Sequence, residues 1–325
     1  MVTDSATCPF LPLGPMVARL RPPGLAAAGR LAHVQPHPGF DKPRQSQPPH
    51  FFLTTMADFL YCLNSSTIRP VPILKKIEIA RRAGYCAIEL WHDDIDAHLA
   101  QGGSLADIRA AVESEGLQVP TTIYLKGWFE TTGPGKRAEW DECARRMRQA
   151  AAVGARHVIA GPPGGRADIE LGARHYRELL ELGLSLGVRP AMEFLGFVDE
   201  LNTIELALEV VQRAGHPAGT VVLDPFHIFR GGGSPESIAQ LKPEQIAIYH
   251  FNDAPRQPPR AQQHDHDRVY PGDGHLDLKQ QLNMLRQIGY RRWISLELFR
   301  EDLWRRDPLE VARVGLEKMR SVVEG

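Results

Sequence analysis

Four residues with the chemistry of metal ligands each follow a short apolar run in the second half of the chain. They are Glu193, Asp224, His250 and Glu297. Three carboxylates brought to one place repel one another unless a cation neutralises them, so a divalent metal ion is the simplest explanation if the four residues meet. Three oxygen ligands and one nitrogen ligand suit Mn²⁺, Mg²⁺, Co²⁺ or Fe²⁺, and Zn²⁺ also accepts such a set. Taken singly, each acid is better explained as a helix cap and the histidine as a hydrogen-bonded core residue, so the prediction rests on the set.

The apolar runs before these residues predict the strands that must position them. The runs cover residues 188–192, 220–223, 246–249 and 293–296. They are too short for helices and lack strict alternation, which is typical of strands buried on both faces of a parallel sheet. Because parallel strands end at the same edge, we expect the four side chains to share one rim.

One sequence unit recurs along residues 56–325: an amphipathic helical stretch, then a glycine, then a short apolar run. The glycine has a physical reason, since it adopts the left-handed conformation at the end of a helix without strain. With a first strand at 59–63, eight strands alternate with helices. This predicts a single-domain α/β fold, a (β/α)₈ TIM barrel, which typically has about 250 residues. An open doubly wound sheet is the alternative, but no G-x-G-x-x-G motif follows the first predicted strand.

The helical stretch after the first predicted strand has a charged side. Ile73 and Ile77 recur at helical spacing and are predicted to be buried. The charged residues Lys75, Lys76 and Glu78 fall on the other faces, which predicts a solvated surface there.

Composition excludes several classes of protein. The 325 residues carry 38 Lys and Arg against 39 Asp and Glu, a formal net charge of -1, so no excess of basic residues is available for nucleic acid. No apolar run approaches the roughly 20 residues of a membrane-spanning helix. The four cysteines form no C-x-x-C pair, which predicts neither a zinc knuckle nor a disulfide framework and fits a cytoplasmic protein.

The first 55 residues differ from the rest of the chain. Ten of the 26 prolines lie there, and no hydrophobic period survives, which predicts a disordered N-terminal extension. A transit peptide is one explanation of this segment. We prefer a translation start at Met56, which directly precedes the first predicted strand.

Five motifs carry a resemblance to a known family. They are A-M-E-F-L-G (191–196), V-L-D-P-F-H (222–227), I-Y-H-F-N-D (248–253), D-R-V-Y-P-G-D-G-H-L-D-L (267–278) and I-S-L-E-L-F (294–299). Together they resemble the xylose-isomerase-like family of sugar phosphate isomerases and epimerases. Within that family the resemblance is strongest to inosose (2-keto-myo-inositol) isomerases of inositol catabolism, and it extends over residues 56–325.

The resemblance implies roles for the residues at the strand ends. Glu193, Asp224, His250 and Glu297 match the residues that bind one divalent metal ion in that family, and the glutamates among them are the candidates for moving protons. The resemblance also suggests that His227 contacts a substrate oxygen. The alternative for His227 is a hydrogen bond to one of the ligand carboxylates.

Three further residues are candidates for binding substrate. Arg256 lies where related ketose 3-epimerases carry a substrate arginine, although its proline-rich loop is also typical of a solvated side chain. Arg268 lies close to two glycines that allow a loop to fold over the site, and its alternative is a salt bridge to Asp265 or Asp267. Glu89 ends the second predicted strand, where a polar contact to substrate competes with an ordinary hydrogen bond at the rim.

These residues predict an isomerase or epimerase acting on a sugar or cyclic polyol ketone through an enediolate, with a divalent metal stabilising the developing negative charge. A dehydratase of a keto-polyol or keto acid forms the same enolate and then expels a hydroxyl. An endonuclease IV-like phosphodiesterase and a non-catalytic sugar-binding barrel are weaker alternatives, because Val269 replaces a ligand histidine of the former and the full ligand set argues against the latter. The expected partner is a small sugar or cyclitol, without nucleic acid or membrane, and a homo-oligomer is compatible with the sequence.

Overall fold

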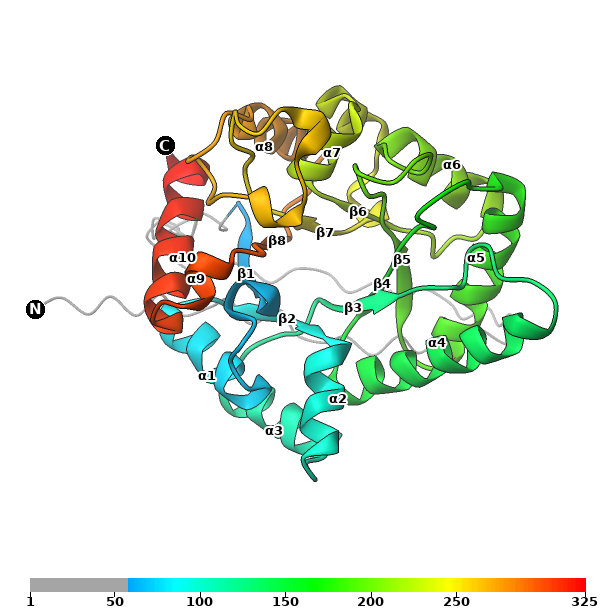
Figure 1. The fold of residues 1–325 in the computed structure, drawn as a ribbon, viewed down its shortest axis with the longest axis horizontal. Coiled ribbons are helices and arrows are strands. Elements are labelled where there is room, and N and C mark those ends of the chain that lie inside the picture. The colour runs from blue at the N-terminus through cyan, green and yellow to red at the C-terminus, as the bar shows by residue number, and fades with distance from the viewer. Residues whose placement is uncertain (1–57) are drawn as a thin grey trace, which may run out of the picture. The chain divides into compact units, whose positions relative to one another are not determined.

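The computed structural model describes residues 58–325, which form a closed barrel of eight parallel strands (Figure 1). β1 pairs with both β2 and β8, which closes the sheet. The predicted (β/α)₈ barrel is therefore confirmed and the open sheet is excluded. The predicted disordered extension, residues 1–55, lies outside the described residues. The strands are β1 (Leu60–Asn64), β2 (Ala87–Trp91), β3 (Thr121–Leu125), β4 (His157–Ala160), β5 (Arg189–Met192), β6 (Val221–Leu223), β7 (Ile246–His250) and β8 (Trp293–Leu296).

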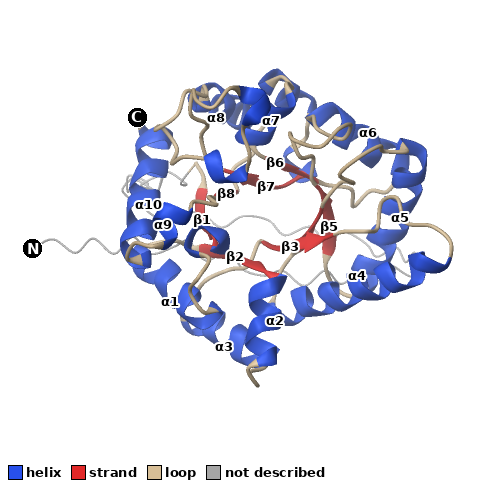
Figure 2. Cartoon of the chain, viewed as in Figure 1, coloured by secondary structure: helices blue, strands red, loops and turns tan. Residues whose placement is uncertain are grey.

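Helices surround the strands, as Figure 2 shows. Gly84 and Gly154 end α1 and α4 with φ angles of 103° and 85°, as the recurring glycine predicted. No helix in the described part of the chain is long and apolar enough to cross a membrane. The helices are α1 (Ile73–Ala83), α2 (His92–Ala100), α3 (Leu105–Ser114), α4 (Pro134–Val153), α5 (Ile169–Ser185), α6 (Ile204–Ala214), α7 (Pro225–Gly231), α8 (Leu278–Gln287), α9 (Glu301–Trp304) and α10 (Pro308–Glu324), with 3₁₀ turns η1 (Ser65–Ile68), η2 (Pro235–Gln240), η3 (Pro243–Gln245), η4 (Arg260–Gln262) and η5 (Asp265–Asp267).

The core has two parts, because alternate strand residues point to opposite faces of the sheet. The larger part lies between strands and helices. The smaller one fills the barrel with strand residues such as Cys62, Ala191, Val222 and Ile248. Two residues further along each of these strands, the same inward row reaches the carboxyl end of the barrel, where polar side chains replace the apolar ones.

One prediction about the helix surface is wrong. Lys76 was expected on a solvated face of α1, but its side chain is fully buried. Its Nζ lies 2.6 Å from Oδ2 of Asp94 in α2. A partner from the next helix therefore stabilises this charge away from water.

Candidate metal and substrate site

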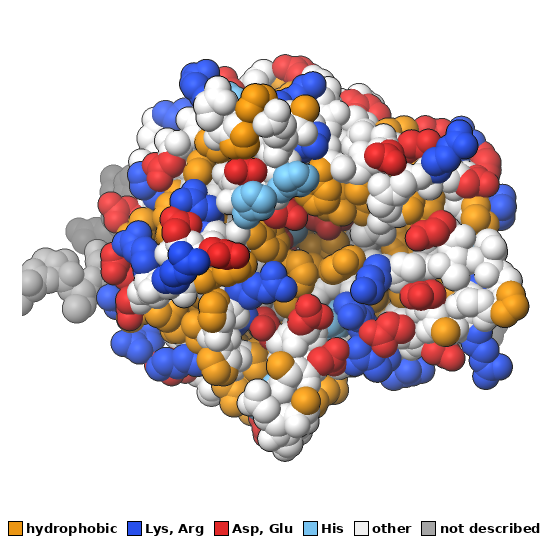
Figure 3. Space-filling model, in the orientation of Figure 1, with side chains coloured by type: hydrophobic (Ala, Val, Ile, Leu, Met, Phe, Trp, Pro, Cys, Tyr) orange, Lys and Arg blue, Asp and Glu red, His pale blue; other side chains and the backbone are white. Residues whose placement is uncertain are grey.

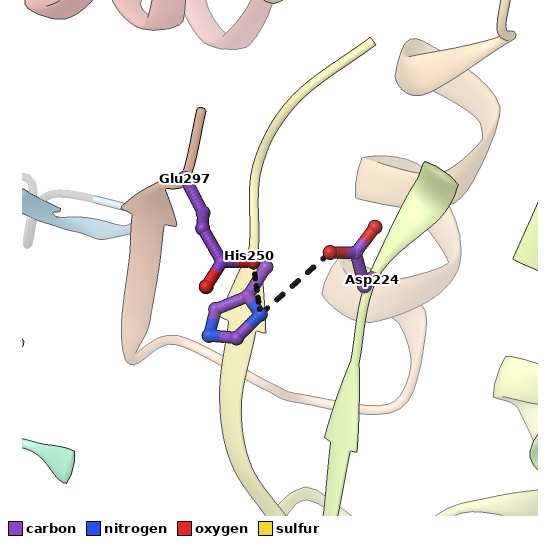
Figure 4. A group of neighbouring side chains, drawn as sticks. All are labelled: Asp224, His250 and Glu297. Carbon is purple, nitrogen blue, oxygen red and sulfur yellow. Dashed lines mark ion pairs between the residues drawn. The ribbon is translucent and has the colours of Figure 1, made fainter. Parts of the chain in front are cut away.

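The four predicted ligands meet at the carboxyl end of the barrel. Glu193, Asp224 and Glu297 directly follow β5, β6 and β8, and His250 is the last residue of β7. Three of them, Asp224, His250 and Glu297, point toward one another (Figure 4). All four are buried. The inward alternation of neighbouring strands thus gathers residues that are far apart in the sequence.

The Nδ1 atom of His250 is the centre of this group. It lies 3.1 Å from Oε2 of Glu297, 3.6 Å from Oδ2 of Asp224 and 3.6 Å from Oε1 of Glu193. One ligand atom from each of Asp224, His250 and Glu297 lies within 4.8 Å of the others, a spacing that can hold a metal ion. Nδ1 is buried and makes no hydrogen bond among the described residues. Three carboxylates around an unpartnered imidazole nitrogen fit a divalent cation.

Glu89 lies behind His250 and does not line the cavity at the carboxyl end of the barrel. Its carboxylate accepts hydrogen bonds from the hydroxyls of Thr121 and Ser295, and from Nδ2 of Asn64 at 3.1 Å. Its Oε1 also lies 3.3 Å from Nε2 of His250. A carboxylate at this place makes Nε2 the protonated nitrogen and leaves Nδ1 free to bind a metal ion. The contacts of Glu89 are those of the second interpretation, an ordinary hydrogen-bonded acid, here beneath the histidine.

Asn64, the last residue of β1, links the buried acids. Its Nδ2 donates to Oε1 of Glu297 at 2.9 Å as well as to Glu89. Its Oδ1 accepts from Nε1 of Trp91 at 2.9 Å and from the backbone of Ser66. One oxygen of Glu297 is thereby fixed, and the other faces His250.

Asp224 is both a helix cap and a member of the cluster. Its Oδ1 accepts from the backbone N–H groups of Phe226 and His227 at the start of α7. Its Oδ2 faces His250 and accepts from Nδ2 of Asn252 at 3.1 Å. One oxygen of Asp224 therefore caps α7, and the other is available to a metal ion.

Arg268 adds a buried positive charge to the same oxygens. Its Nη1 lies 3.2 Å from Oδ2 of Asp224 and contacts Oε2 of Glu297. Its Nη2 lies 2.9 Å from Nε2 of His227 and 2.8 Å from Oδ1 of Asp265. The predicted placement at the site and the alternative salt bridge to Asp265 are thus both present.

Asp253 holds the loop that carries Arg268. Its carboxylate accepts hydrogen bonds from the backbone N–H groups of Gly272, Gly274 and Leu276, at 3.0–3.1 Å. Its own backbone exchanges two hydrogen bonds with Val269. A side chain at position 274 would collide with Asp253 and a neighbouring carbonyl. Asp253 and the two glycines therefore fix the conformation of this loop at the carboxyl end of the barrel.

The charges of the cluster depend on burial and on one another. Burial raises the pKa of Glu193 to about 8, and the carboxylates of Glu297 and Asp224 act in the same direction. Burial also raises the pKa of Asp224, but Arg268, His227 and His250 together outweigh it, so that this pKa lies well below its usual range. For His250 the neighbouring carboxylates outweigh burial and raise the pKa. The site thus contains acids with widely separated affinities for protons.

A cavity of about 910 Å³ opens above the cluster. Figure 3 shows this face with a hollow near its centre, bordered by hydrophobic, acidic, basic and histidine side chains. Among the predicted residues, Glu193, His227, Arg268 and Glu297 line the cavity. Arg256 is exposed and is not among the lining residues, so the structure does not bring it to the others.

Sequence reasoning missed the aromatic and basic wall of this cavity. The wall includes Arg69 after η1, Trp91 at the end of β2, Phe299 after β8 and Trp304 in α9. Trp91 and Phe299 lie at or just after strand ends, so the rule that predicted the acids could also have found them. Arg69 and Trp304 carry no such signal because short loop helices position them.

The fold and the cluster together define a class of protein: a parallel barrel with acids and a histidine at the carboxyl ends of its last four strands. Residues 77–322 match the family described as Xylose isomerase-like TIM barrel. The chain belongs to this family, as its motifs suggested.

Relatives in the family have different activities. The chain is 28% identical over 270 residues to an inosose isomerase of Bacillus velezensis, covering 81% of this chain and 96% of that enzyme. It is 29% identical over 237 residues to a 3-dehydroshikimate dehydratase of Pseudomonas aeruginosa, covering 70% of this chain and 36% of that enzyme. Among solved structures it is similar to the IolI protein with a bound zinc atom, with a TM-score of 0.75, 27% identity and coverage of 82% and 98%.

Proposed function

We propose that this protein is a metal-dependent isomerase or epimerase of a cyclic or open-chain keto-polyol, with an activity close to that of inosose isomerases. The single observation that carries the proposal is the free Nδ1 of His250 among buried carboxylates at the floor of the cavity. The similarity to inosose isomerases and the bound zinc of the IolI protein support it.

The proposed metal ligands are Glu193, Asp224, His250 and Glu297, and the ion is Mn²⁺, Mg²⁺, Co²⁺, Fe²⁺ or Zn²⁺. A bound divalent ion would supply Lewis acidity, which makes the proton next to a substrate carbonyl easier to remove. The acid-rich, histidine-containing set fits any of these ions, so the donor types do not select one.

The side chains of the cavity would carry the proton transfer. Glu193 and Glu297 extend from β5 and β8, so they can flank a substrate from two sides. One carboxylate removes the proton next to the carbonyl and the other returns a proton to the neighbouring carbon. Return to the same carbon from the other face gives epimerisation. In this proposal Arg268 and His227, which line the cavity, bind substrate oxygens and exclude water from this step.

Dehydration is the second candidate, because the chain is also similar to 3-dehydroshikimate dehydratases. The first step is the same removal of a proton next to a carbonyl. The reactions then diverge, since a dehydratase expels a hydroxyl group as water while an isomerase moves the carbonyl. Analysis of the product separates them.

The proposal is tested by exchange of the substrate α-proton in D₂O. Metal-reconstituted protein is incubated with a panel of inososes, ketohexoses and keto acids, and both deuterium uptake and product are followed by NMR. We expect Glu297→Gln and Glu193→Gln to lower the exchange rate at least about a hundredfold, since each removes a proton-transfer group. Glu301→Gln, at the exposed rim of the same cavity, is the matched control and should exchange normally. Near-normal exchange in both cluster variants would rule out this mechanism.

A further inference from the structure

One wall of the cavity is a row of aromatic rings with an arginine at its inner end and a second arginine between the two outer rings. Cζ of Arg268 lies 5.2 Å from the ring centre of Phe299, and the rings of Phe299 and Trp91 are 5.7 Å apart. Cζ of Arg69 then lies 6.0 Å from the ring of Trp91 and 5.8 Å from that of Trp304. Arg268 is buried at the acidic cluster, whereas Arg69 is exposed, so the row runs from the floor of the cavity to its mouth.

The two tryptophans at the outer end are held in place by the scaffold. Nε1 of Trp91 donates to Oδ1 of Asn64, and Nε1 of Trp304 donates to the backbone oxygen of Ser66, both at 2.9 Å. Arg69 lies between two rings that cannot turn away without losing these bonds. Its guanidinium is therefore held at the mouth of the cavity by ring contacts.

Arg69 differs from the other arginines of the cavity in its partners. Arg300 pairs with Asp302 at 2.7 Å, and Arg305 pairs with Glu301 at 3.2 Å. Arg268 is bound by Asp224 and Glu297 of the cluster and by Asp265. Within residues 58–325 Arg69 has neither an ion pair nor a hydrogen bond, only its two ring contacts. The N–H groups at the edge of its guanidinium are thus available to an anion.

The volume of the cavity leaves room for such a group. Sites for drug-sized ligands occupy about 300–1,000 Å³, and this cavity of about 910 Å³ lies near the upper end of that range. A single six-carbon ring above the acidic cluster would fill only part of this volume.

We infer that the substrate carries an anionic group, a carboxylate or a phosphate, on the side away from its reacting carbonyl, and that Arg69 binds this group between Trp91 and Trp304. The inference rests on the proposed function for the position of the carbonyl end, and it narrows the substrate to a keto-polyol or keto acid that, unlike an uncharged inosose, carries this anion. Carboxylate and phosphate both match the paired N–H groups of a guanidinium. The aromatic row between the two arginines provides the surface along which the carbon skeleton lies.

Binding of matched charged and neutral ligands tests this inference. Calorimetry on the metal-loaded full chain compares 3-dehydroshikimate with its methyl ester, and a ketose 6-phosphate with the free ketose. We expect the wild type to bind at least one anion about tenfold more tightly than its neutral counterpart, the effect of a charge-assisted hydrogen bond. Arg69→Gln should abolish this preference without weakening the neutral ligands. The pair that shows the preference identifies carboxylate or phosphate.

Arg305→Gln is the matched control, because it removes the same charge from an arginine of the rim that already has a carboxylate partner. It should keep the preference within about twofold, as expected for an exposed pair. The inference is overturned if the wild type shows no preference in either pair, or if Arg69→Gln retains it. Exchange of the α-proton is measured on the same samples: exchange without a charge preference contradicts only this inference, and a charge preference without exchange contradicts only the proposed function.

Discussion

At the scale of single residues, the site depends on which nitrogen of His250 carries the proton. Glu89 faces Nε2, and the three carboxylates of the cluster face Nδ1. The pKa of Glu89 lies below its ordinary value because His250 and the hydroxyl donors outweigh the effect of burial. An ionised acceptor beneath the ring keeps the proton on Nε2, so the lone pair on Nδ1 is directed toward the proposed metal ion.

Glu89 does not contact the proposed metal ion, but its replacement by glutamine should still weaken metal binding through His250. The amide nitrogen would replace one carboxylate oxygen. It would place N–H donors either against Thr121 and Nε2 of His250 or against Ser295 and Nδ2 of Asn64, all of which are already donors. We expect the dissociation constant for Mn²⁺, measured by calorimetry, to rise about 10–100-fold.

The control for this substitution is Glu244→Gln, an exposed glutamate in η3 just before β7. Its metal affinity should equal that of the wild type. Melting of the metal-free proteins checks that Glu89→Gln still folds. Folded Glu89→Gln with an unchanged dissociation constant would show that Glu89 does not orient His250.

At the scale of elements, the first residue of α2 joins this helix to α4. His92 is fully buried, and its Nδ1 donates to Oε1 of Gln149 at 2.8 Å. Its Nε2 has no hydrogen-bond partner among the described residues. Burial, together with the nearby positive charge of Arg146, lowers the pKa of His92 to about 4. The packing of α2 on α4 therefore requires a neutral imidazole.

This requirement makes stability depend on pH in a known direction. Below about pH 6.5 the imidazole of the unfolded chain binds a proton, whereas the folded one does not until about pH 4. The buried His92 therefore lowers the free energy of unfolding as the pH falls through this window, by about 1.4 kcal/mol per pH unit and roughly 3 kcal/mol in all. We expect urea unfolding of His92→Phe at pH 7, 6, 5 and 4.5 to show a shallower loss than the wild type. Parallel losses in the two proteins would contradict this.

At the scale of the whole molecule, the repeating helix–glycine–strand unit was enough to predict the barrel, and the rule that strand ends converge was enough to predict the acidic cluster. The supporting contacts were not predictable. Glu89 binds residues of β1, β3, β7 and β8, and only closure of the barrel brings these strands together. Lys76 looked solvated because its partner, Asp94, belongs to the next helix. Arg69 follows β1 and Trp304 follows β8, so these two residues meet only because β1 pairs with β8.

The most direct test of the account is the rate of α-proton exchange, measured while metal is returned to the chelated protein. The central claim is that β5 to β8 together hold one divalent ion on which catalysis depends. We predict no exchange after chelation, and a rate that rises linearly with added Mn²⁺ and becomes constant at one equivalent per chain. Undiminished exchange in the chelated protein, with residual metal excluded by elemental analysis, would contradict the account.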